Sequence, residues 1–178
     1  MREIRILGIS GSLRAVSSHR SLLAAAASIV PAGVVLEISS SIGNLPLFNP
    51  DLADAAPDSV LRFRAEIAAA DAVLIASPEY AHGVTGAMKN ALDWLVGSGE
   101  FSGKPIAALN ASPRSFHAHE SLLEILRTMD ARVIPEASIR IPLSSSQATE
   151  QEISSDKRLI GLLGEAVMAL IEAAGRQG

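Results

Sequence analysis

Short apolar runs alternate along the chain with longer stretches in which apolar residues recur at helical spacing. Five runs predict strands, at residues 4–9, 34–38, 73–76, 106–110 and from 133–134 onward. The stretches between and after them predict helices at 18–30, 58–70, 87–96, 118–129 and 151–174, with Asp58 as the N-cap of the second. This alternation is typical of an α/β domain in which helices cover both faces of a parallel sheet.

Every residue of the run Val73–Ala76 is apolar, as expected for a strand that is buried on both faces in the middle of such a sheet. Right-handed crossovers restrict the topology, and the strand order 2-1-3-4-5 is one common solution. That order opens a ligand crevice where strands 1 and 3 diverge. The alternation fits a Rossmann order equally well, so the loops after the strands must decide. A length of 178 residues predicts one domain, residues 1–178.

Composition narrows the function classes. Hydrophobic residues make up 48% of the chain, which predicts a folded core, while aromatic residues make up 3% and the net charge is −4. We therefore expect neither nucleic acid nor a membrane as partner, because both need basic or aromatic surface. The absence of cysteine excludes disulfides and zinc–thiolate sites and fits a cytoplasmic location. Glu165 and Glu172 interrupt the most apolar late stretch, which predicts a core-packed helix.

The loop after the first strand is rich in hydroxyl groups and leads into a helix. Residues 10–19 have the sequence SGSLRAVSSH. The N–H groups and the dipole of a helix N-terminus favour an anion, and the arginine at position 14 can form two parallel hydrogen bonds to phosphate oxygens. Helix capping would explain one or two of the four serines, but not all four together with Arg14. The loop therefore predicts a site for a terminal phosphate group.

Three other interpretations of this loop are weaker. A nucleotide triphosphatase loop requires a lysine that is missing after Gly11. A hydrolase nucleophile elbow requires glycine where Ser12 stands. A dinucleotide fingerprint requires three glycines, and only Gly8 and Gly11 occur, although Glu37 ends the second strand where a ribose-binding acid would lie. A Rossmann-type NAD-dependent dehydrogenase remains an alternative.

The loop after the third strand makes the resemblance to a known family specific. Residues 77–94 have the sequence SPEYAHGVTGAMKNALDW, and residues 45–48 have the sequence LPLF. Together with GSLR at 11–14 and Ser17, these segments closely resemble the NADPH-dependent FMN reductase family, which includes chromate, quinone and azo-dye reductases. The family marks, GSLR-x-x-S and PEY…G…LKN-x-x-DW, stand in the same order, and the resemblance covers nearly the whole chain.

The resemblance implies a flavodoxin-like, doubly wound sheet of order 2-1-3-4-5 that binds FMN. It implies an enzyme that passes hydride from NADPH or NADH through flavin N5 to a small acceptor, such as a quinone, free flavin, azo dye or metal oxyanion. It also implies a homodimer or homotetramer. A non-enzymatic electron carrier of the flavodoxin type is a further alternative, although such carriers are usually more acidic.

The resemblance also implies which residues bind the cofactor, and it assigns no catalytic side chain because the flavin performs the chemistry. The implied FMN contacts are Ser10, Ser12, Arg14, Ser17, Ser18 and His19 after the first strand, Pro78, Glu79, Tyr80, Ala81, His82 and Gly83 after the third, and Ser112 after the fourth. His19 stands where relatives usually have asparagine, and Ala81-His82 replaces a different pair. The loop 111–117 has fewer glycines than in relatives, so the resemblance does not predict its shape. Arg114 in this loop is a candidate partner for a reduced flavin.

His117, His119 and Glu120 are the residues that could suggest a metal site. A zinc-binding HExxH helix would need a second histidine at position 123, which is leucine. We therefore expect no bound metal.

Overall fold

The computed structural model describes residues 2–176, and its centre is a five-stranded parallel sheet. The strands are β1 (Ile4–Ser10), β2 (Val34–Ile38), β3 (Ala72–Ala76), β6 (Pro105–Leu109) and β7 (Arg132–Val133). They lie side by side in the order β2-β1-β3-β6-β7, which is 2-1-3-4-5 when the main strands are counted along the chain. The predicted doubly wound fold is confirmed.

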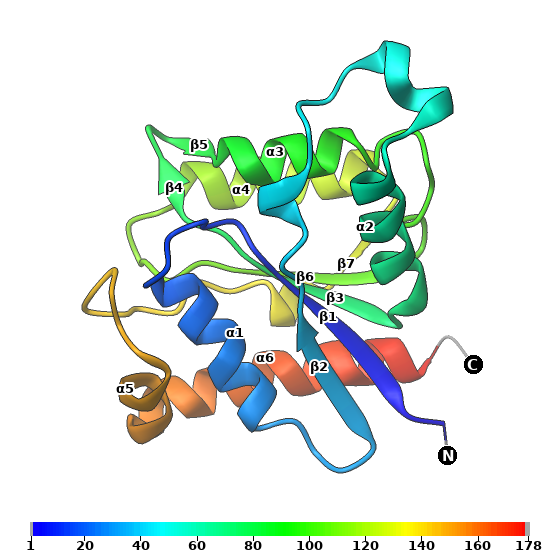
Figure 1. The fold of residues 1–178 in the computed structure, drawn as a ribbon. Coiled ribbons are helices and arrows are strands. Elements are labelled where there is room, and N and C mark those ends of the chain that lie inside the picture. Colours follow the sequence, from blue (N-terminus) through cyan, green and yellow to red (C-terminus); the bar gives the residue numbers. More distant parts are fainter. Residues whose placement is uncertain (1, 177–178) are drawn as a thin grey trace.

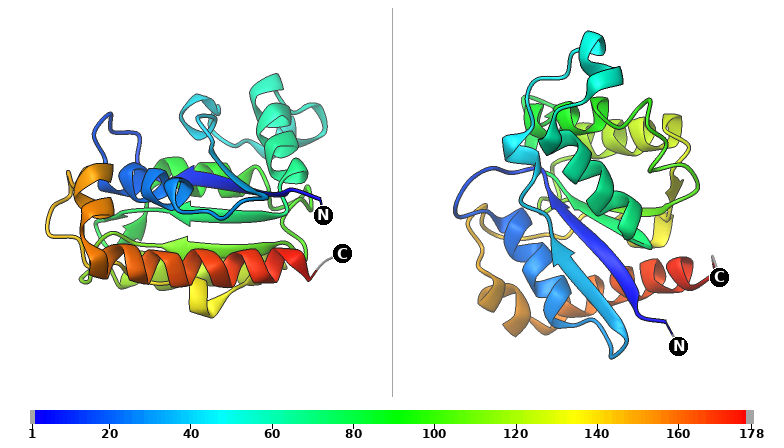
Figure 2. Two further views of the ribbon diagram at one scale, coloured as in Figure 1. Left: turned by 90° about the horizontal axis from the view of Figure 1, so that it is seen from below. Right: turned by 45° about the vertical axis from the view of Figure 1, so that its right-hand side comes forward.

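Helices cover both faces of the sheet (Figures 1 and 2). The helices α1 (Ser18–Ser28), α5 (Glu150–Ser155) and α6 (Lys157–Gly175) lie on one face, and α2 (Asp58–Ala69), α3 (Gly86–Asp93) and α4 (His117–Thr128) lie on the other. Alternate residues of β3 enter the two cores, with Leu74 packing toward α1 and α6 and Ile75 toward α3 and α4. Both side chains are fully buried, which contributes about 1.5–3 kcal/mol each and explains why this run is apolar throughout.

The predicted C-terminal helix is two helices, because side-chain caps interrupt it. The hydroxyl of Thr149 accepts the N–H of Glu152 while the Glu152 carboxylate accepts the Thr149 N–H, which is the capping box that starts α5. Asp156 then accepts the N–H groups of Arg158 and Leu159, at 2.9 and 3.1 Å, and starts α6. The prediction of one helix from 151 to 174 missed this break because the apolar spacing continues across it.

Several segments predicted as loops contain short elements. The segment 39–57 includes the 3-10 helices η1 (Ile42–Asn44) and η2 (Pro50–Ala55), and the segment 77–86 includes a hairpin of β4 (Glu79–Tyr80) and β5 (Gly83–Val84). Beyond β7 comes η3 (Pro135–Ala137), after which Arg140 pairs with Asn110 to extend the sheet edge. Asp58 is the first residue of α2 and not its N-cap, which is Pro57.

The segment 45–56 projects from the body of the molecule beside α2 and α3 (Figures 1 and 2). Its base is fixed by α3: Asn90 and the Trp94 indole both donate to the carbonyl oxygen of Pro46, at 3.0 and 2.8 Å. Asn90 also accepts the N–H of Phe48, whose ring meets the Trp94 ring edge-on at 5.1 Å. Asn90 and Trp94 therefore serve as loop-fixing and packing residues.

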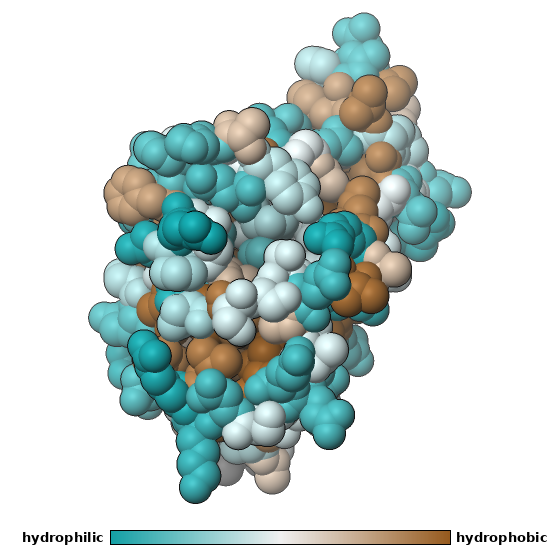
Figure 3. Space-filling model, turned by 90° about the vertical axis from the view of Figure 1, so that its left-hand side faces the viewer, coloured by the Kyte–Doolittle hydropathy of each residue, from teal (hydrophilic) through white to brown (hydrophobic). Residues whose placement is uncertain are grey.

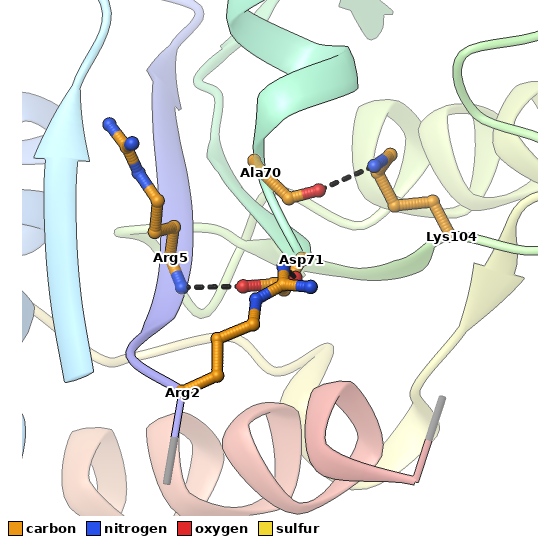
Figure 4. A network of polar contacts seen from close by, with 5 residues as sticks. All are labelled: Arg2, Arg5, Ala70, Asp71 and Lys104. Carbon is orange, nitrogen blue, oxygen red and sulfur yellow. Dashed lines mark hydrogen bonds and ion pairs between the residues drawn. The ribbon is translucent and has the colours of Figure 1, made fainter. Parts of the chain in front are cut away.

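A separate polar network ties the strands together at their amino ends (Figure 4). The Asp71 carboxylate accepts the backbone N–H of Arg5 at 2.8 Å and contacts the Arg2 guanidinium, while Lys104 donates to the carbonyl oxygen of Ala70 at 2.5 Å. Burial lowers the pKa of Lys104. This network lies at the opposite edge of the sheet from the loops considered below. No helix within residues 2–176 is long and apolar enough to cross a membrane.

Candidate functional site

Three loops meet at the carboxyl edge of the sheet, which Figure 3 shows facing the viewer with hydrophobic surface ringed by hydrophilic residues. We call them the β1 loop (residues 11–17), the β3 loop (77–85) and the β6 loop (110–116). They follow neighbouring strands, because β3 pairs with both β1 and β6. Parallel strands end at the same edge, so every predicted cofactor contact lies on one of these loops, on the adjoining end of β1, or on the first turn of α1.

Side chains join the three loops to one another. The Thr85 hydroxyl donates to the carbonyl oxygen of Gly11 at 2.8 Å, and the Asn110 amide donates to that of Ser77 at 2.9 Å. The N–H of Ala111 donates to His19 Nε2 at 3.2 Å. These bonds connect residues up to 92 positions apart, so the loops form one preformed unit. Sequence reasoning gave no role to Thr85 or Asn110, although each is a polar residue close to the end of a strand or the start of a helix.

His19 is buried and neutral. Its side chain is 7% exposed, and burial lowers its pKa to about 4, although a hydrogen bond with the Asn110 side chain opposes the shift. Because Nε2 accepts the Ala111 N–H, the ring carries its proton on Nδ1. An asparagine side chain at position 19 could accept the same N–H through its amide oxygen.

The start of α1 presents donors that no group of the described residues accepts. Ser17 is the N-cap, but its hydroxyl makes no capping hydrogen bond, and the N–H groups of His19 and Arg20 have no acceptor in the described chain. The Ser18 hydroxyl is likewise without a partner there, and Arg14 is exposed and forms no ion pair with residues 2–176. A phosphomonoester needs this combination of hydroxyl, amide and guanidinium donors, so the residues fit the phosphate group of FMN.

Ser10 and Ser12 shape the β1 loop. The Ser10 hydroxyl donates to the carbonyl oxygen of Ser12 and accepts its N–H, both at 3.3 Å. The Ser12 hydroxyl accepts the N–H of Arg14 at 3.4 Å, which leaves its own proton free to donate. Between them, Gly11 passes so close to the β3 loop that a Cβ atom would lie 2.2 Å from Ser77 Oγ. The loop can therefore hold this position only with glycine.

The β3 loop is a tight hairpin whose turn residues, Ala81 and His82, have the left-handed φ values 49° and 60°. Residues other than glycine adopt this conformation at a cost, about 1–3 kcal/mol each, and strain of this kind is concentrated at functional sites. The Glu79 carboxylate accepts the N–H of Ala118 at 2.8 Å and so caps α4, whose own N-cap, Phe116, provides no side-chain acceptor. The hairpin is thereby fixed to the start of α4.

Aromatic contacts reinforce this junction. The His82 ring stacks on the His117 ring, with centroids 4.5 Å apart and planes 16° from parallel. Phe116 meets His117 edge-on at 5.8 Å and carries the Arg140 guanidinium 5.5 Å above its ring. Tyr80 is 53% exposed on the same hairpin. Of the predicted ring contacts, Glu79 thus has a structural partner already, whereas Tyr80 is open to a ligand.

Polar turns shape the β6 loop in place of the missing glycines. Asn110 Oδ1 accepts the N–H of Ser112 at 2.9 Å, and the Ser112 hydroxyl accepts the N–H of Arg114 at 3.2 Å. Ser112 therefore lies at the same edge as the other predicted contacts, while Arg114 is exposed.

Two residues named in alternative interpretations lie elsewhere or have other partners. Glu37, the candidate ribose-binding acid of a Rossmann site, lies 3.5 Å from the Arg5 guanidinium. His119 is buried in α4, and burial lowers its pKa. Residues 2–176 contain no group of three or more histidine, aspartate or glutamate side chains placed to hold a metal ion.

Comparisons with known proteins identify the family of the chain. The family model of NADPH-dependent FMN reductase matches residues 4–144. The chain is 37% identical over 174 residues to the NAD(P)H-dependent FMN reductase of Pseudomonas aeruginosa, with 94% of each chain covered. It is 39% identical over 138 residues to a quinone reductase of Pseudomonas putida, covering 72% of this chain and 74% of that protein.

Among solved structures, the fold matches the flavoenzyme NAD(P)H:(acceptor) oxidoreductase FerB of Paracoccus denitrificans. The TM-score is 0.79 at 26% identity, with 98% of this chain and 99% of that chain covered. The chain therefore belongs to the NADPH-dependent FMN reductase family, which confirms the expected class of enzyme, a flavin-dependent NAD(P)H oxidoreductase.

Proposed function

We propose that FMN binds across the three loops and that a quinone is the acceptor of its electrons. The observation that carries the proposal is the start of α1, where hydroxyl, amide and guanidinium donors have no partner among residues 2–176 and lie beside loops that are already joined to one another. A preformed site loses little conformational entropy when it binds a ligand. The similarity to a quinone reductase of Pseudomonas putida supports the choice of acceptor.

The proposed contact residues divide into those that hold the phosphate and those that support the ring system. Arg14, Ser12, Ser17, Ser18 and the N–H groups at the start of α1 hold the phosphate, with Ser10 and His19 fixing the loop around it. The segment Pro78–Gly83 supports the ring system, and Ser112 closes its far edge. Bound FMN supplies the redox chemistry, the acceptance of hydride from NAD(P)H and its delivery to the acceptor. The protein contributes orientation and electrostatics.

The proposal includes assembly of two or four chains and a cytoplasmic location, where reduced pyridine nucleotide is available. Apolar side chains are exposed on the projecting segment and beside it: Leu47 is 85% exposed, Leu52 40%, Leu61 50% and Val96 63%. An apolar surface of this kind on a folded domain is typical of a contact between subunits.

The decisive experiment is a titration of the apo protein with FMN, followed by absorbance, and then steady-state oxidation of NADPH with a quinone. We expect FMN to bind at micromolar concentration or below, and NADPH to be consumed only when quinone is present. A protein that binds FMN but turns over no NADPH would be an electron carrier of the flavodoxin type. A protein that ignores FMN would refute the proposal.

A further inference from the structure

A pocket of about 250 Å³ opens between the β1 loop and the segment that follows β2. Arg14, Arg20 and Ser40 line it, together with Ser10, Ser12 and Ser39. Ser17 and Ser18, the free hydroxyls at the start of α1, do not line it. The pocket therefore lies on the side of the β1 loop that faces β2. It shares Ser12 and Arg14 with the phosphate site proposed above, and it adds the Arg20 side chain and Ser40, to which that site assigns no role.

The pocket has two positive charges that the described chain does not neutralise. Arg14 and Arg20 are both exposed, and neither forms an ion pair with residues 2–176. Glu66 is engaged elsewhere, because its two carboxylate oxygens accept the hydroxyls of Ser39 and Ser41, each at 2.5 Å. Arg14 holds the FMN phosphate in the function proposed above, so Arg20 is the guanidinium of this pocket that remains available to a second phosphate group once FMN is bound.

Ser40 adds neutral donors to these charges. The hydroxyl of its neighbour Ser39 is committed to Glu66 and accepts the N–H of Ser41 at 3.1 Å. Ser40 itself has neither its hydroxyl nor its N–H bonded within the described chain. Glu66 thus holds the segment after β2 in place, while Ser40 remains available to a ligand.

We propose that this pocket binds the 2′-phosphate of NADPH and that Arg20 is the residue that makes the enzyme prefer NADPH to NADH. The inference rests on the proposed function, in which both nucleotides would react at the flavin. The two differ by one phosphomonoester dianion, so preference requires a cation at that phosphate and not at the ring. Arg20 supplies a guanidinium that the FMN site does not use.

The test is calorimetric titration of the FMN-loaded protein with NADP⁺ and with NAD⁺, which requires no turnover. In Arg20→Gln we expect the affinity for NADP⁺ to fall about 10- to 100-fold, the size expected for losing a charge-assisted hydrogen bond, while NAD⁺ binding changes less than about twofold. The KM for NADPH should rise in parallel, with kcat unchanged. Ser40→Ala should show a smaller effect in the same direction.

The matched control is Arg158→Gln. Arg158 is an exposed arginine in the first turn of α6, so this variant changes the net charge by the same amount as Arg20→Gln and leaves the pocket intact. It should leave the NADP⁺ to NAD⁺ ratio as in the wild type. If Arg20→Gln weakens FMN and leaves that ratio unchanged, the pocket holds the FMN phosphate and the proposal is overturned. An unchanged ratio with unchanged FMN affinity overturns it as well. Failure of the proposed function would appear separately, as a wild-type protein that takes up no FMN.

Discussion

His19 illustrates how a single buried side chain can hold two loops together and make that junction sensitive to pH. Its imidazole must be neutral to accept the Ala111 N–H, and burial lowers its pKa from 6.5 to about 4. Between these two values the unfolded chain binds a proton that the folded chain does not. The free energy of unfolding therefore decreases as the pH falls from 6.5 to 4.

We predict that His19→Asn reduces this acid destabilisation. For the wild type the full loss attributable to His19 is about 3 kcal/mol, because each pKa unit corresponds to about 1.4 kcal/mol. Urea denaturation at pH 7 and pH 4.5 measures the difference. The variant should lose less stability than the wild type, and what remains includes His119, whose pKa is also lowered by burial. Equal pH slopes in the two proteins would show that His19 is not neutral in the fold.

Arg14 carries the corresponding prediction for binding. Arg14→Ala should weaken FMN by about 1.5–3 kcal/mol, the value of hydrogen bonds to charged groups, whereas Arg14→Lys should recover part of the loss because it keeps the charge but not the planar fork. Quenching of FMN fluorescence during titration measures the affinity of both variants, and Arg158→Gln is the control for the change in net charge. Unchanged affinity in Arg14→Ala would place the phosphate elsewhere.

The grouping of some residues at this edge of the sheet could be predicted from the sequence, whereas the grouping of others could not. Ser12, Arg14 and Ser17 stand within six positions of one another, so their donors converge in any fold that makes a loop there. Thr85 and Asn110 act through bonds to Gly11 and Ser77, partners 74 and 33 positions away. No local pattern specifies such partners, because they depend on which strands become neighbours.

At the scale of elements, caps supplied by distant residues decide where helices start. The N-cap of α4 is Phe116, which offers no side-chain acceptor, and Glu79 of β4 takes the N–H of Ala118 instead. The carboxylate also lies at the positive end of the helix dipole. One side chain therefore stabilises α4 and at the same time fixes the hairpin proposed to carry the flavin ring.

Glu79→Ala should consequently have two effects. We expect the free energy of unfolding to fall by about 1–2 kcal/mol, as for loss of an N-cap, and FMN affinity to fall because the hairpin is less firmly held. Chemical denaturation and FMN titration measure these, and faster amide hydrogen exchange at Ala118 would report the lost cap. Asp156→Ala is the matched control, since it removes the N-cap of α6, a helix that carries none of the proposed FMN contacts. If both variants affect FMN equally, the hairpin is not positioned by Glu79.

For the whole molecule, the order of the main strands follows from short apolar runs and right-handed crossovers, and this part of the fold could be predicted. The projecting segment could not, because residues 45–56 have no helical or strand periodicity. They are held instead by contacts of Asn90 and Trp94 with Pro46 and Phe48. These contacts support a segment whose outer side chains, Leu47 and Leu52, remain exposed.

Exposing Leu47 at 85% of its side chain would be costly in a monomer, since the burial of a leucine contributes about 1.5–3 kcal/mol. We therefore predict that the projecting segment is covered by a second copy of the chain and that Leu47→Asp dissociates the assembly, because burying a leucine is favourable whereas burying a carboxylate without a partner is strongly unfavourable. Sedimentation velocity measures the mass. Met168→Asp, at a 44% exposed position of α6 on the other face of the sheet, introduces the same charge and should leave the assembly intact. A Leu47→Asp protein with the mass of the wild type would show that the chains pair through another surface, whereas dissociation in Leu47→Asp alone would place the contact on the segment that α3 holds in position.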